Sequence, residues 1–347
     1  MIYENALKGR DFIRLQDFTK EEIVTILNSA LELKNNYKGK ILNILEGKTL
    51  SMIFFNPSLR TRISFENGIY QLGGHSNFLE PRVIRIPSLE GEDIAYQSER
   101  ISDMARILNS MSEGIAIRIL GDSIGWSYDK GLKIIEEFAC WAEVPVINME
   151  DNIYHPCQGI ADALTLREMF GTDLRGRKLG VSWVYSESAK KPIAPLHDVM
   201  YAASFFGPDI VYTKPPELRI DPEIEKQIKE NVEKNGGTYQ VSDRFEDAFA
   251  NADAVYARNH VSLDLMPPFK KEPGHKEMAD MFKKYKNWMV TEELMKLGKK
   301  HIKYMHCLPC ERGMEVSDEV VDGERSAVWN EASNRLHGQK AVMSLIM

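Results

Sequence analysis

Apolar residues along the chain alternate between short continuous runs and helical spacing. The run at residues 51–55 stops at an Asn-Pro pair, and apolar positions then recur three and four residues apart through Ile69 and Leu72. A short run bounded by a turn indicates a buried strand, and the longer spacing indicates a helix. This stretch therefore predicts a strand, a tight turn and a helix.

The same alternation continues along the chain in two blocks. In the first block, further strand-like runs lie at 76–79, 114–118 and 144–149, and helical spacing lies at 98–111 and 159–170. From residue 175 the pattern restarts, with strand-like runs at 178–184, 209–213, 239–241, 254–256, 288–290 and 303–305, and helical spacing at 196–206, 221–235 and 246–251. Strands that alternate with helices in this way indicate parallel sheets covered by helices on both faces.

We therefore predict an α/β protein with two doubly wound parallel-sheet domains. The first domain is expected at residues 1–150, completed by a C-terminal helix at 330–347, and the second at residues 151–329. Such sheets bind ligands at the carboxyl ends of their strands, so we expect an active-site cleft between the domains. No G-x-G-x-x-G follows a predicted strand, which argues against a nicotinamide cofactor.

Residues 17–22 carry the signature of a helix start. Thr19 and Glu22 have the spacing of a capping box, in which each side chain satisfies a backbone N–H of the other residue. Ile23, Leu27 and Leu31 then recur on one face, as in a helix that packs on a core. The first helix is therefore expected to begin next to Thr19.

Hydroxyl and guanidinium groups are concentrated after residue 57. Ser58, Arg60, Thr61 and Arg62 lie within five residues at a predicted helix start. Backbone N–H groups there lack partners and the helix dipole is positive, so the turn favours an anion. Arginine adds paired donors that fit a phosphate. We favour a phosphate site over the alternative, in which the arginines are surface charges and Ser58 only caps the helix.

Other polar residues also lie where α/β proteins bind ligands. Arg118 ends a buried-type strand, and His155 lies where a strand passes through a loop into a helix. Strand ends present ligands in α/β sheets, and a histidine can donate to an oxygen on which charge develops. Residues 80–96 are expected to form a loop that carries Arg82 and Arg85, for which a solvated basic loop is the alternative.

Composition narrows the class of protein. The chain has 347 residues, 43% of them hydrophobic, and a net charge of −7, which fits a two-domain globular enzyme and does not favour a nucleic-acid partner. No apolar run could span a bilayer and residues 1–5 lack an export signal, so we expect a cytoplasmic protein without a membrane partner. Cys307 and Cys310 form a single C-x-x-C, which without a second pair or a βαβ setting favours neither zinc nor redox chemistry.

Four sequence blocks together resemble one known family. Residues 58–62, Ser-Leu-Arg-Thr-Arg, resemble the Ser-x-Arg-Thr-Arg carbamoyl-phosphate loop of the aspartate and ornithine transcarbamylases. Arg118, residues 155–158 (His-Pro-Cys-Gln) and residues 306–309 (His-Cys-Leu-Pro), with 334–337 (Asn-Arg-Leu-His) behind them, match the same family in the same order. The resemblance covers essentially the whole chain.

The resemblance implies attack by an amine on carbamoyl phosphate, with no metal or other cofactor. The residues that it implies for binding carbamoyl phosphate are Ser58, Leu59, Arg60, Thr61, Arg62, Arg118, His155, Gln158, Cys307, Leu308 and Arg335. Of these, His155, Arg118 and Thr61 are the implied catalytic residues, which polarise the carbonyl oxygen. Cys307 acting as a nucleophile is the competing interpretation.

The positions that imply the identity of the acceptor amine resemble different branches of the family. Ornithine enzymes generally have an aspartate for the substrate's α-ammonium where this chain has Arg258, and a reversed charge should repel that ammonium. Glu150 also resembles the acyl-ornithine branch, whereas residues 310–316 resemble ornithine and putrescine enzymes, with Glu315 in place of a modified lysine. The implied acceptor contacts are Glu150, Arg258, Asn259, Ser262, Cys307, Arg312, Arg82 and Arg85. We expect a small ornithine-like acceptor without a free α-ammonium, with ornithine itself as the alternative.

Three more expectations follow from the resemblance. Residues 186–195 are similar to the loop through which acyl-ornithine enzymes thread the chain, so a trefoil knot is expected in the second domain, although knots are otherwise almost absent from proteins. Transcarbamylases share active sites between subunits, which implies a homotrimer in which Arg82 or Arg85 serves the neighbouring chain. The alternative to an enzyme is a regulatory protein that binds carbamoyl phosphate without transferring it.

Overall fold

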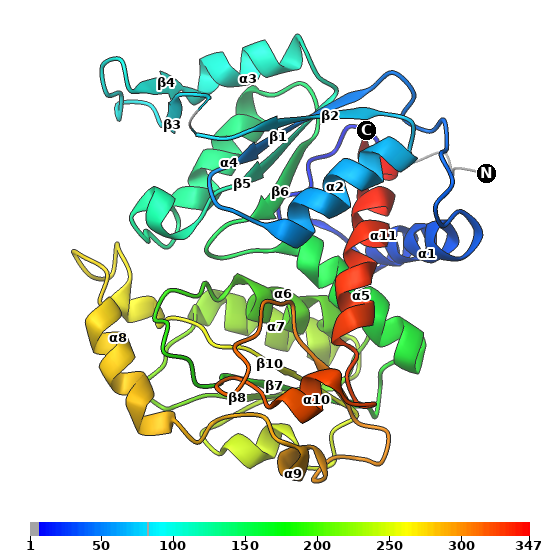
Figure 1. The fold of residues 1–347 in the computed structure, drawn as a ribbon, viewed down its shortest axis with the longest axis vertical. Helices are drawn as coiled ribbons and strands as arrows, with labels where there is room; N and C mark the ends of the chain where they lie inside the picture. Colours follow the sequence, from blue (N-terminus) through cyan, green and yellow to red (C-terminus); the bar gives the residue numbers. More distant parts are fainter. Residues whose placement is uncertain (1–6, 82) are drawn as a thin grey trace. The chain divides into compact units, whose positions relative to one another are not determined.

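The computed structural model describes residues 7–81 and 83–347, and the chain divides into two compact units. The first unit contains the chain up to Ile124, Asp129–Ile160 and Arg335–Met347, and the second contains Gly125–Tyr128 and Ala161–Asn334. Each unit is built on its own parallel sheet (Figure 1). Two helices, α5 (Pro156–Phe170) and α11 (Val328–Ile346), have residues in both units.

The sheet of the first unit has four parallel strands in the order β2-β1-β5-β6. Its strands are β1 (Thr49–Phe54), β2 (His75–Leu79), β5 (Gly114–Arg118) and β6 (Val146–Glu150). Its helices are α1 (Lys20–Asn36), α2 (Leu59–Gln71), α3 (Ile101–Asn109), α4 (Lys130–Trp141) and parts of α5 and α11, with 3-10 turns at Leu15–Asp17 and Gly121–Ile124. The chain runs outward from β1 to β2 and then outward on the other side through β5 and β6, so the strand order reverses between β1 and β5.

The sheet of the second unit has five parallel strands in the order β11-β10-β7-β8-β9. Its strands are β7 (Lys178–Ser182), β8 (Asp209–Thr213), β9 (Thr238–Ser242), β10 (Ala254–Ala257) and β11 (Lys303–Met305). Its helices are α6 (Ala194–Ser204), α7 (Pro222–Lys234), α8 (His275–Phe282), α9 (Glu292–Met295) and α10 (Asp318–Asp322), with 3-10 turns at Phe245–Ala248, Leu263–Leu265 and Lys283–Tyr285. Here the strand order reverses between β7 and β10. The knot expected in this unit stays a prediction.

The predicted fold class is confirmed by these two doubly wound parallel sheets, and the central strands show why the sequence reveals it. All five residues of β6 are buried, and so are the apolar residues of β1 and β5. Strands covered by helices on both faces are apolar on both faces, which produces continuous apolar runs. In the described part of the chain, no helix combines the length and the apolar character needed to cross a membrane.

Some predicted elements are wrong. Residues 86–88 are not loop but strand β3 (Ile86–Ser88), which pairs with β4 (Ser98–Arg100) in a separate two-stranded parallel sheet. Helix α3 therefore starts only at Ile101, three residues later than predicted. Residues 288–290 form an isolated bridge at Val290 instead of a strand, and the predicted helix at 246–251 is a 3-10 turn. Helices α4 and α8 lie outside the predicted elements.

The C-terminal part of α11 packs closely on α2 within the first unit. A Cβ atom added to Gly68 would lie 2.8 Å from Met343 Cε and 3.3 Å from Lys340 Cγ, so glycine permits this approach. Lys340 is fully buried, and its Nζ donates to Gln71 Oε1 at 2.9 Å. This packing holds Arg335, at the start of the same part of α11, against the N-terminal turn of α2.

Candidate active site

The first candidate site lies at the carboxyl ends of β1 and β5, where the strand order reverses. The register pairs Phe54 at the end of β1 with Arg118 at the end of β5. Ser58 caps the helix that follows β1, and its side chain accepts a hydrogen bond from the Thr61 backbone at 3.4 Å. Doubly wound sheets bind ligands at such a switch point, and a helix N-terminus there favours an anion.

The two arginines of the loop lie on different sides of α2. Arg62 is exposed; its Nε lies 2.9 Å from Glu66 Oε1, and its guanidinium carbon lies 3.7 Å from the centre of the Phe78 ring. Arg60 is half-buried and acts electrostatically on Arg335. Two residues apart in a helix correspond to a rotation of about 200°. The structure thus brings Arg60, and not Arg62, toward Arg335.

The outer side of the same loop is a separate surface. Leu59 is 68% exposed. A pocket of about 630 Å³ on this side is lined by Phe54, Phe55, Asn56, Pro57, Ser58, Leu59, Arg62, Phe78, Glu80 and Pro81. Leu59 and Arg62, both predicted to bind carbamoyl phosphate, therefore face this pocket.

Arg335 connects three of the predicted site residues. It is 2% exposed, and its guanidinium donates to Gln158 Oε1 at 2.8 Å and to Thr61 Oγ1 at 2.9 Å. The same group lies 3.4 Å from His155 Nε2. Residues from α2, from the start of α5 and from α11 thus meet within the first unit.

The charge of this site is predominantly positive. Burial lowers the pKa of Arg335, Glu150 opposes this effect, and the neighbouring cations Arg60 and Arg118 lower the pKa further. Arg118 donates to the Glu150 carboxylate, and His155 Nε2 lies 3.4 Å from Glu150 Oε2. Within the described part of the chain, the buried Arg118 Nε has no hydrogen-bond partner. Arg335 is therefore influenced by two further guanidinium groups and by one glutamate carboxylate, which leaves an excess of positive charge among these side chains.

A buried carboxylate shapes the loop that carries His155. Asp151 Oδ1 accepts hydrogen bonds from the backbones of Ile153 at 2.6 Å and Tyr154 at 3.1 Å, and Oδ2 accepts one from Asn148 Nδ2 at 2.6 Å. Burial raises the pKa of Asp151 to about 7, against the opposing effect of these hydrogen bonds. This loop directly precedes α5 and fixes the backbone at His155.

The second candidate site lies at the carboxyl ends of β7 and β10 in the second unit. Arg258 directly follows β10, is 9% exposed, and donates through its guanidinium to the Pro192 carbonyl at 2.6 Å. Asn259 is fully buried; its backbone donates to Glu315 Oε1 at 2.9 Å and its Nδ2 to the Val184 carbonyl at 2.8 Å. Among the described residues, Asn259 Oδ1 has no hydrogen-bond partner.

The loop after β10 is held by further buried polar contacts. Ser262 Oγ donates to Asp264 Oδ1 at 2.6 Å and accepts from the Arg219 backbone at 2.9 Å, so its hydroxyl is occupied by the loop itself. His260 Nε2 lies 2.6 Å from the Tyr212 hydroxyl. Burial lowers the pKa of His260 to about 3, so the ring is neutral and acts as a structural support.

The turn that contains Cys307 follows β11. Leu308 has a φ of 55°, and its backbone N–H donates to His306 Nδ1 at 2.8 Å. The other ring nitrogen, Nε2, lies 3.6 Å from Glu315 Oε2. Since Nδ1 accepts a hydrogen bond, the ring proton belongs on Nε2 and faces this carboxylate.

Cys307 lies in an environment that favours its thiolate. Burial raises the pKa of its thiol, but the positive charge of Arg258 and the neighbouring His306 ring outweigh burial and bring the pKa to about 6. Burial raises the pKa of the Cys310 thiol, so the two cysteines of the C-x-x-C differ. Cys307 and Leu308 belong to the second unit, together with the predicted acceptor residues Arg258, Asn259 and Ser262, whereas Glu150 belongs to the first unit.

Two of the described predicted acceptor residues, Arg312 and Arg85, make their contacts away from the second candidate site. Arg312 donates to Asp318 and Asp322 at 2.6 to 2.8 Å on the exposed surface of the second unit. Arg85 donates to the Tyr96 carbonyl within its own loop, in the first unit. Arg82 lies outside the described residues.

Sequence reasoning missed buried charges in the second unit. Lys191, on the loop at 186–195, lies 3.1 Å from both Glu311 Oε1 and Glu315 Oε2. Glu331 accepts from the His306 backbone at 2.9 Å, and burial together with Asp162 raises its pKa well above the ordinary value. For Lys191, a charged residue within a proline-containing loop was a sequence feature that could have revealed it. No sequence feature pointed to Glu331. No three His, Cys, Asp or Glu side chains within the described ranges are grouped so that they could hold a metal ion.

Two parallel α/β units, one of them with a guanidinium-rich switch point, are typical of enzymes that act on small anionic ligands. Residues 10–168 match the family model described as aspartate/ornithine carbamoyltransferase, carbamoyl-P binding domain, and residues 194–346 match the Asp/Orn binding domain of the same family. The chain therefore belongs to the aspartate/ornithine carbamoyltransferase family, as its four sequence blocks predict.

Similar proteins come from two branches of this family. The chain is 37% identical to the ornithine carbamoyltransferase of Thermococcus kodakarensis over 99% of this chain and 98% of that protein. It is 35% identical to the N-acetylornithine carbamoyltransferase of Xylella fastidiosa over 97% of this chain and 98% of that protein. A crystal structure of acetylornithine transcarbamylase complexed with acetylcitrulline has a TM-score of 0.90 at 34% identity, over 97% of this chain and 99% of that one.

Proposed function

We propose that this protein transfers the carbamoyl group of carbamoyl phosphate to the amine of an ornithine-like acceptor and releases phosphate. The observation that carries the proposal is the convergence of Arg60, Arg118 and Arg335 at the switch point of the first unit, around Thr61. Neighbouring guanidinium groups that repel one another are stabilised by a multiply charged anion. A structural neighbour was solved with carbamyl phosphate and N-succinyl-L-norvaline, which supports this ligand class.

In the proposed reaction an uncharged amine attacks the carbonyl carbon. A C–N bond forms, the amine loses a proton, and the C–O bond to phosphate breaks with the electron pair leaving on phosphate. Arg60, Thr61 and the α2 N-terminus hold the phosphate, and Arg335 supports both Thr61 and the departing charge. These groups are fixed before reaction, so they stabilise charge without reorganisation.

The carbonyl group is assigned to the other side of this site. His155 and Arg118 both contact the Glu150 carboxylate. Both side chains can donate to an oxygen on which charge develops. Gln158 accepts a hydrogen bond from Arg335, and in the proposed complex its side-chain oxygen also accepts one from the carbamoyl amide. Arg118 pairs with the Glu150 carboxylate in the structure. We propose that, when the ligand binds, Arg118 donates to the carbonyl oxygen instead, and that Glu150 becomes free to contact the acceptor.

The acceptor is proposed to be an ornithine whose α-nitrogen carries an acyl group. Arg258 and Asn259 follow β10 at the switch point of the second unit, which matches an Asp/Orn binding domain. A guanidinium attracts an acyl oxygen or a carboxylate and repels an α-ammonium. Ornithine itself is the second candidate, since Glu315 provides a buried carboxylate beside Asn259.

The test measures phosphate release from carbamoyl phosphate with ornithine, N-acetylornithine, N-succinylornithine, putrescine and aspartate. We expect turnover with an ornithine derivative, and we expect Arg335→Gln to weaken carbamoyl-phosphate binding by at least about tenfold, because a buried donor to phosphate and to Thr61 is lost. The exposed Arg244→Gln serves as a matched control that should keep the wild-type affinity.

A different outcome would support the alternative of a regulatory protein. Carbamoyl phosphate that raises the melting temperature while no acceptor gives turnover would show binding without catalysis; saturation at 100 times the Kd stabilises by about 2.7 kcal/mol. If the compound neither binds nor reacts, the assignment of the arginine site is wrong.

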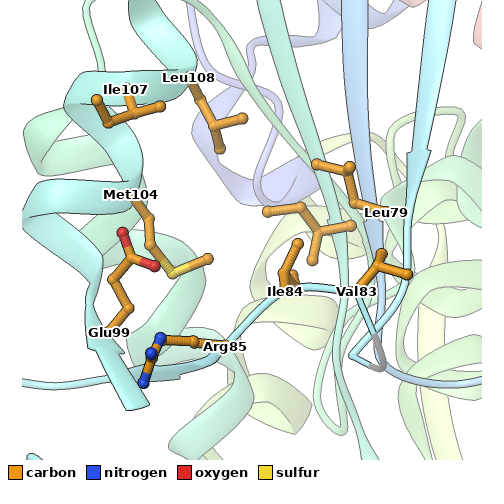
Figure 2. Close-up of a pocket in the computed structure, with 9 residues that line it drawn as sticks. Leu79, Val83, Ile84, Arg85, Glu99, Met104, Ile107 and Leu108 are labelled. Carbon is orange, nitrogen blue, oxygen red and sulfur yellow. The ribbon is translucent and has the colours of Figure 1, made fainter. Parts of the chain in front are cut away.

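We further propose that the protein is a homotrimer that shares its sites. An apolar groove of about 520 Å³ lies between the loop after β2 and helix α3, with Arg85 and Glu99 beside one another at one end (Figure 2). Val83 and Ile107 at this groove are 67% and 54% exposed, and Met111 nearby in sequence is 69% exposed. Apolar exposure of this kind marks an interaction surface, and a second copy of the chain is the proposed occupant.

A further inference from the structure

The loop at residues 186–195 connects the parts of the second unit that carry acceptor candidates. Lys191 Nζ lies 3.1 Å from Glu311 Oε1 and 3.1 Å from Glu315 Oε2. Ser186, at the start of the loop, donates to Glu311 Oε2 at 2.6 Å. The loop is therefore tied through charge to the segment that follows Cys307.

The backbone of the same loop holds the segment after β10. The Lys191 carbonyl accepts from the Val261 backbone at 3.0 Å, and the Pro192 carbonyl accepts from the Arg258 guanidinium at 2.6 Å. Two neighbouring residues of the loop thus fix both segments. The Pro192 carbonyl holds the Arg258 side chain, and the Lys191 ammonium holds Glu315. A shift of Lys191 would move both acceptor segments.

Glu315 requires a cation because it is fully buried. It accepts two backbone hydrogen bonds, from Asn259 at 2.9 Å and Glu311 at 2.8 Å, and it faces His306 at 3.6 Å. Burial raises its pKa, but His306 and Lys191 outweigh burial and keep the carboxylate ionised. Removal of one partner from a buried ion pair leaves an uncompensated charge.

We propose that Lys191 is a positioning residue that sets acceptor selectivity, because its ammonium pairs with Glu311 and Glu315 and offsets part of their negative charge. Arg258 is thereby left to determine which α-substituent is accepted. With Lys191 in place, an acylated α-nitrogen is favoured over an α-ammonium. Without Lys191, the two carboxylates attract an ammonium group. This inference deepens the proposed function and rests on it.

The experiment compares Lys191→Met, Lys191→Arg and the matched control Lys190→Met, which removes the exposed neighbouring lysine from the same loop. For each variant, kcat and KM are measured with N-acetylornithine and with ornithine, and the Kd of carbamoyl phosphate is measured separately. We expect Lys191→Met to reduce the ratio of kcat/KM for the acylated acceptor over ornithine by at least about tenfold, mainly through KM. Lys191→Arg should restore most of the ratio, and the Kd should stay unchanged in all three.

Two results would overturn the inference. The first is an unchanged ratio in Lys191→Met, and the second is an equal change in Lys190→Met. Should Lys191→Met fail to fold, Glu311→Gln tests the same electrostatics in the opposite direction: it removes a carboxylate, so the preference for the acylated acceptor should stay or increase, and a decrease contradicts the inference. Failure of the proposed function is distinguishable, because the wild-type protein would then turn over neither acceptor.

Discussion

Arg60, Thr61 and His155 each belong to a short motif whose placement at a strand end can be predicted from the sequence. Their meeting with Arg335 cannot, because Thr61 and Arg335 are 274 positions apart and are joined by the packing of α11 on α2. Only the resemblance pointed to Arg335. The opposite orientation of Arg62 could have been predicted, since alternate residues of a helix face different sides.

The Cys307 thiol should titrate far below an ordinary thiol. Ultraviolet absorbance of the thiolate, measured against Cys307→Ser as background, should change with a midpoint at pH about 6, because Arg258 and His306 stabilise the anion. The folded pKa is lowered from about 9, so this group stabilises the fold fully above pH 9, and the contribution is lost as the pH falls through about 6.

Arg258→Met provides the check on this assignment. Burial raises the pKa of the Cys307 thiol, and the Arg258 guanidinium opposes that effect. Without the guanidinium, the midpoint of the thiol titration should therefore rise toward or above 9. Cys310→Ser should leave the midpoint near 6, because burial already raises the pKa of Cys310. A midpoint that stays near 6 in Arg258→Met would show that Arg258 does not support the thiolate.

Arg258 should also determine which acceptor is used. Arg258→Asp reverses the charge at the switch point of the second unit, so activity with ornithine relative to N-acetylornithine should rise by about tenfold or more. The measurement is kcat/KM for both acceptors in the wild-type protein and the variant. Asp243→Arg, a charge reversal of the same size at a position after β9, is the control and should leave the ratio unaltered.

At the scale of elements, local sequence signals predicted where helices start better than they predicted which strands pair. The Thr19–Glu22 capping box is confirmed, with Thr19 Oγ1 accepting at 3.2 Å and Glu22 Oε2 accepting at 2.8 Å. Strands β3 and β4 were missed because each has three residues and is stabilised by its partner instead of by an apolar run. Such short pairs carry no period that a sequence pattern can reveal.

Strand β7 depends on a glycine for its place in the sheet. A Cβ atom on Gly180 would lie 1.9 Å from the Ala248 carbonyl oxygen, and the clash is with backbone, so the turn at Phe245–Ala248 must shift. Gly180→Ala should therefore lower the free energy of unfolding by about 3 kcal/mol. Urea denaturation provides the measurement, and Val241→Ala on the exposed side of β9 should change stability by less than about 0.5 kcal/mol.

At the scale of the whole molecule, alternation of strands and helices was enough to predict two doubly wound sheets. The strand order within each sheet, and with it the position of each switch point, could not be predicted, because it depends on which strands pair across long separations. The same limit applies to the pairing of Arg118 with Glu150, which sit at the ends of neighbouring strands β5 and β6.

Shared sites predict complementation between inactive chains. Arg335→Gln disables the chain's own phosphate site, and Arg85→Gln disables the loop proposed to act on a neighbour. In a trimer reassembled from equal amounts of both, about a quarter of the sites pair an intact Arg335 with an intact neighbouring Arg85 and should regain activity. Activity that never exceeds that of the separate variants would contradict the shared site, and sedimentation analysis would report the assembly.

The two helices that pass from one unit to the other limit how this molecule can be divided. Residues 156–160 and 335–346 belong to the first unit, whereas the rest of α5 and α11 belong to the second. A truncated gene that ends after residue 160 would encode the phosphate loop without its third guanidinium, and neither half can be exchanged with a homologue except by a junction inside a continuous helix. We therefore expect recombination between genes of this family to keep the residue register of both helices, α5 and α11, unchanged at the junctions.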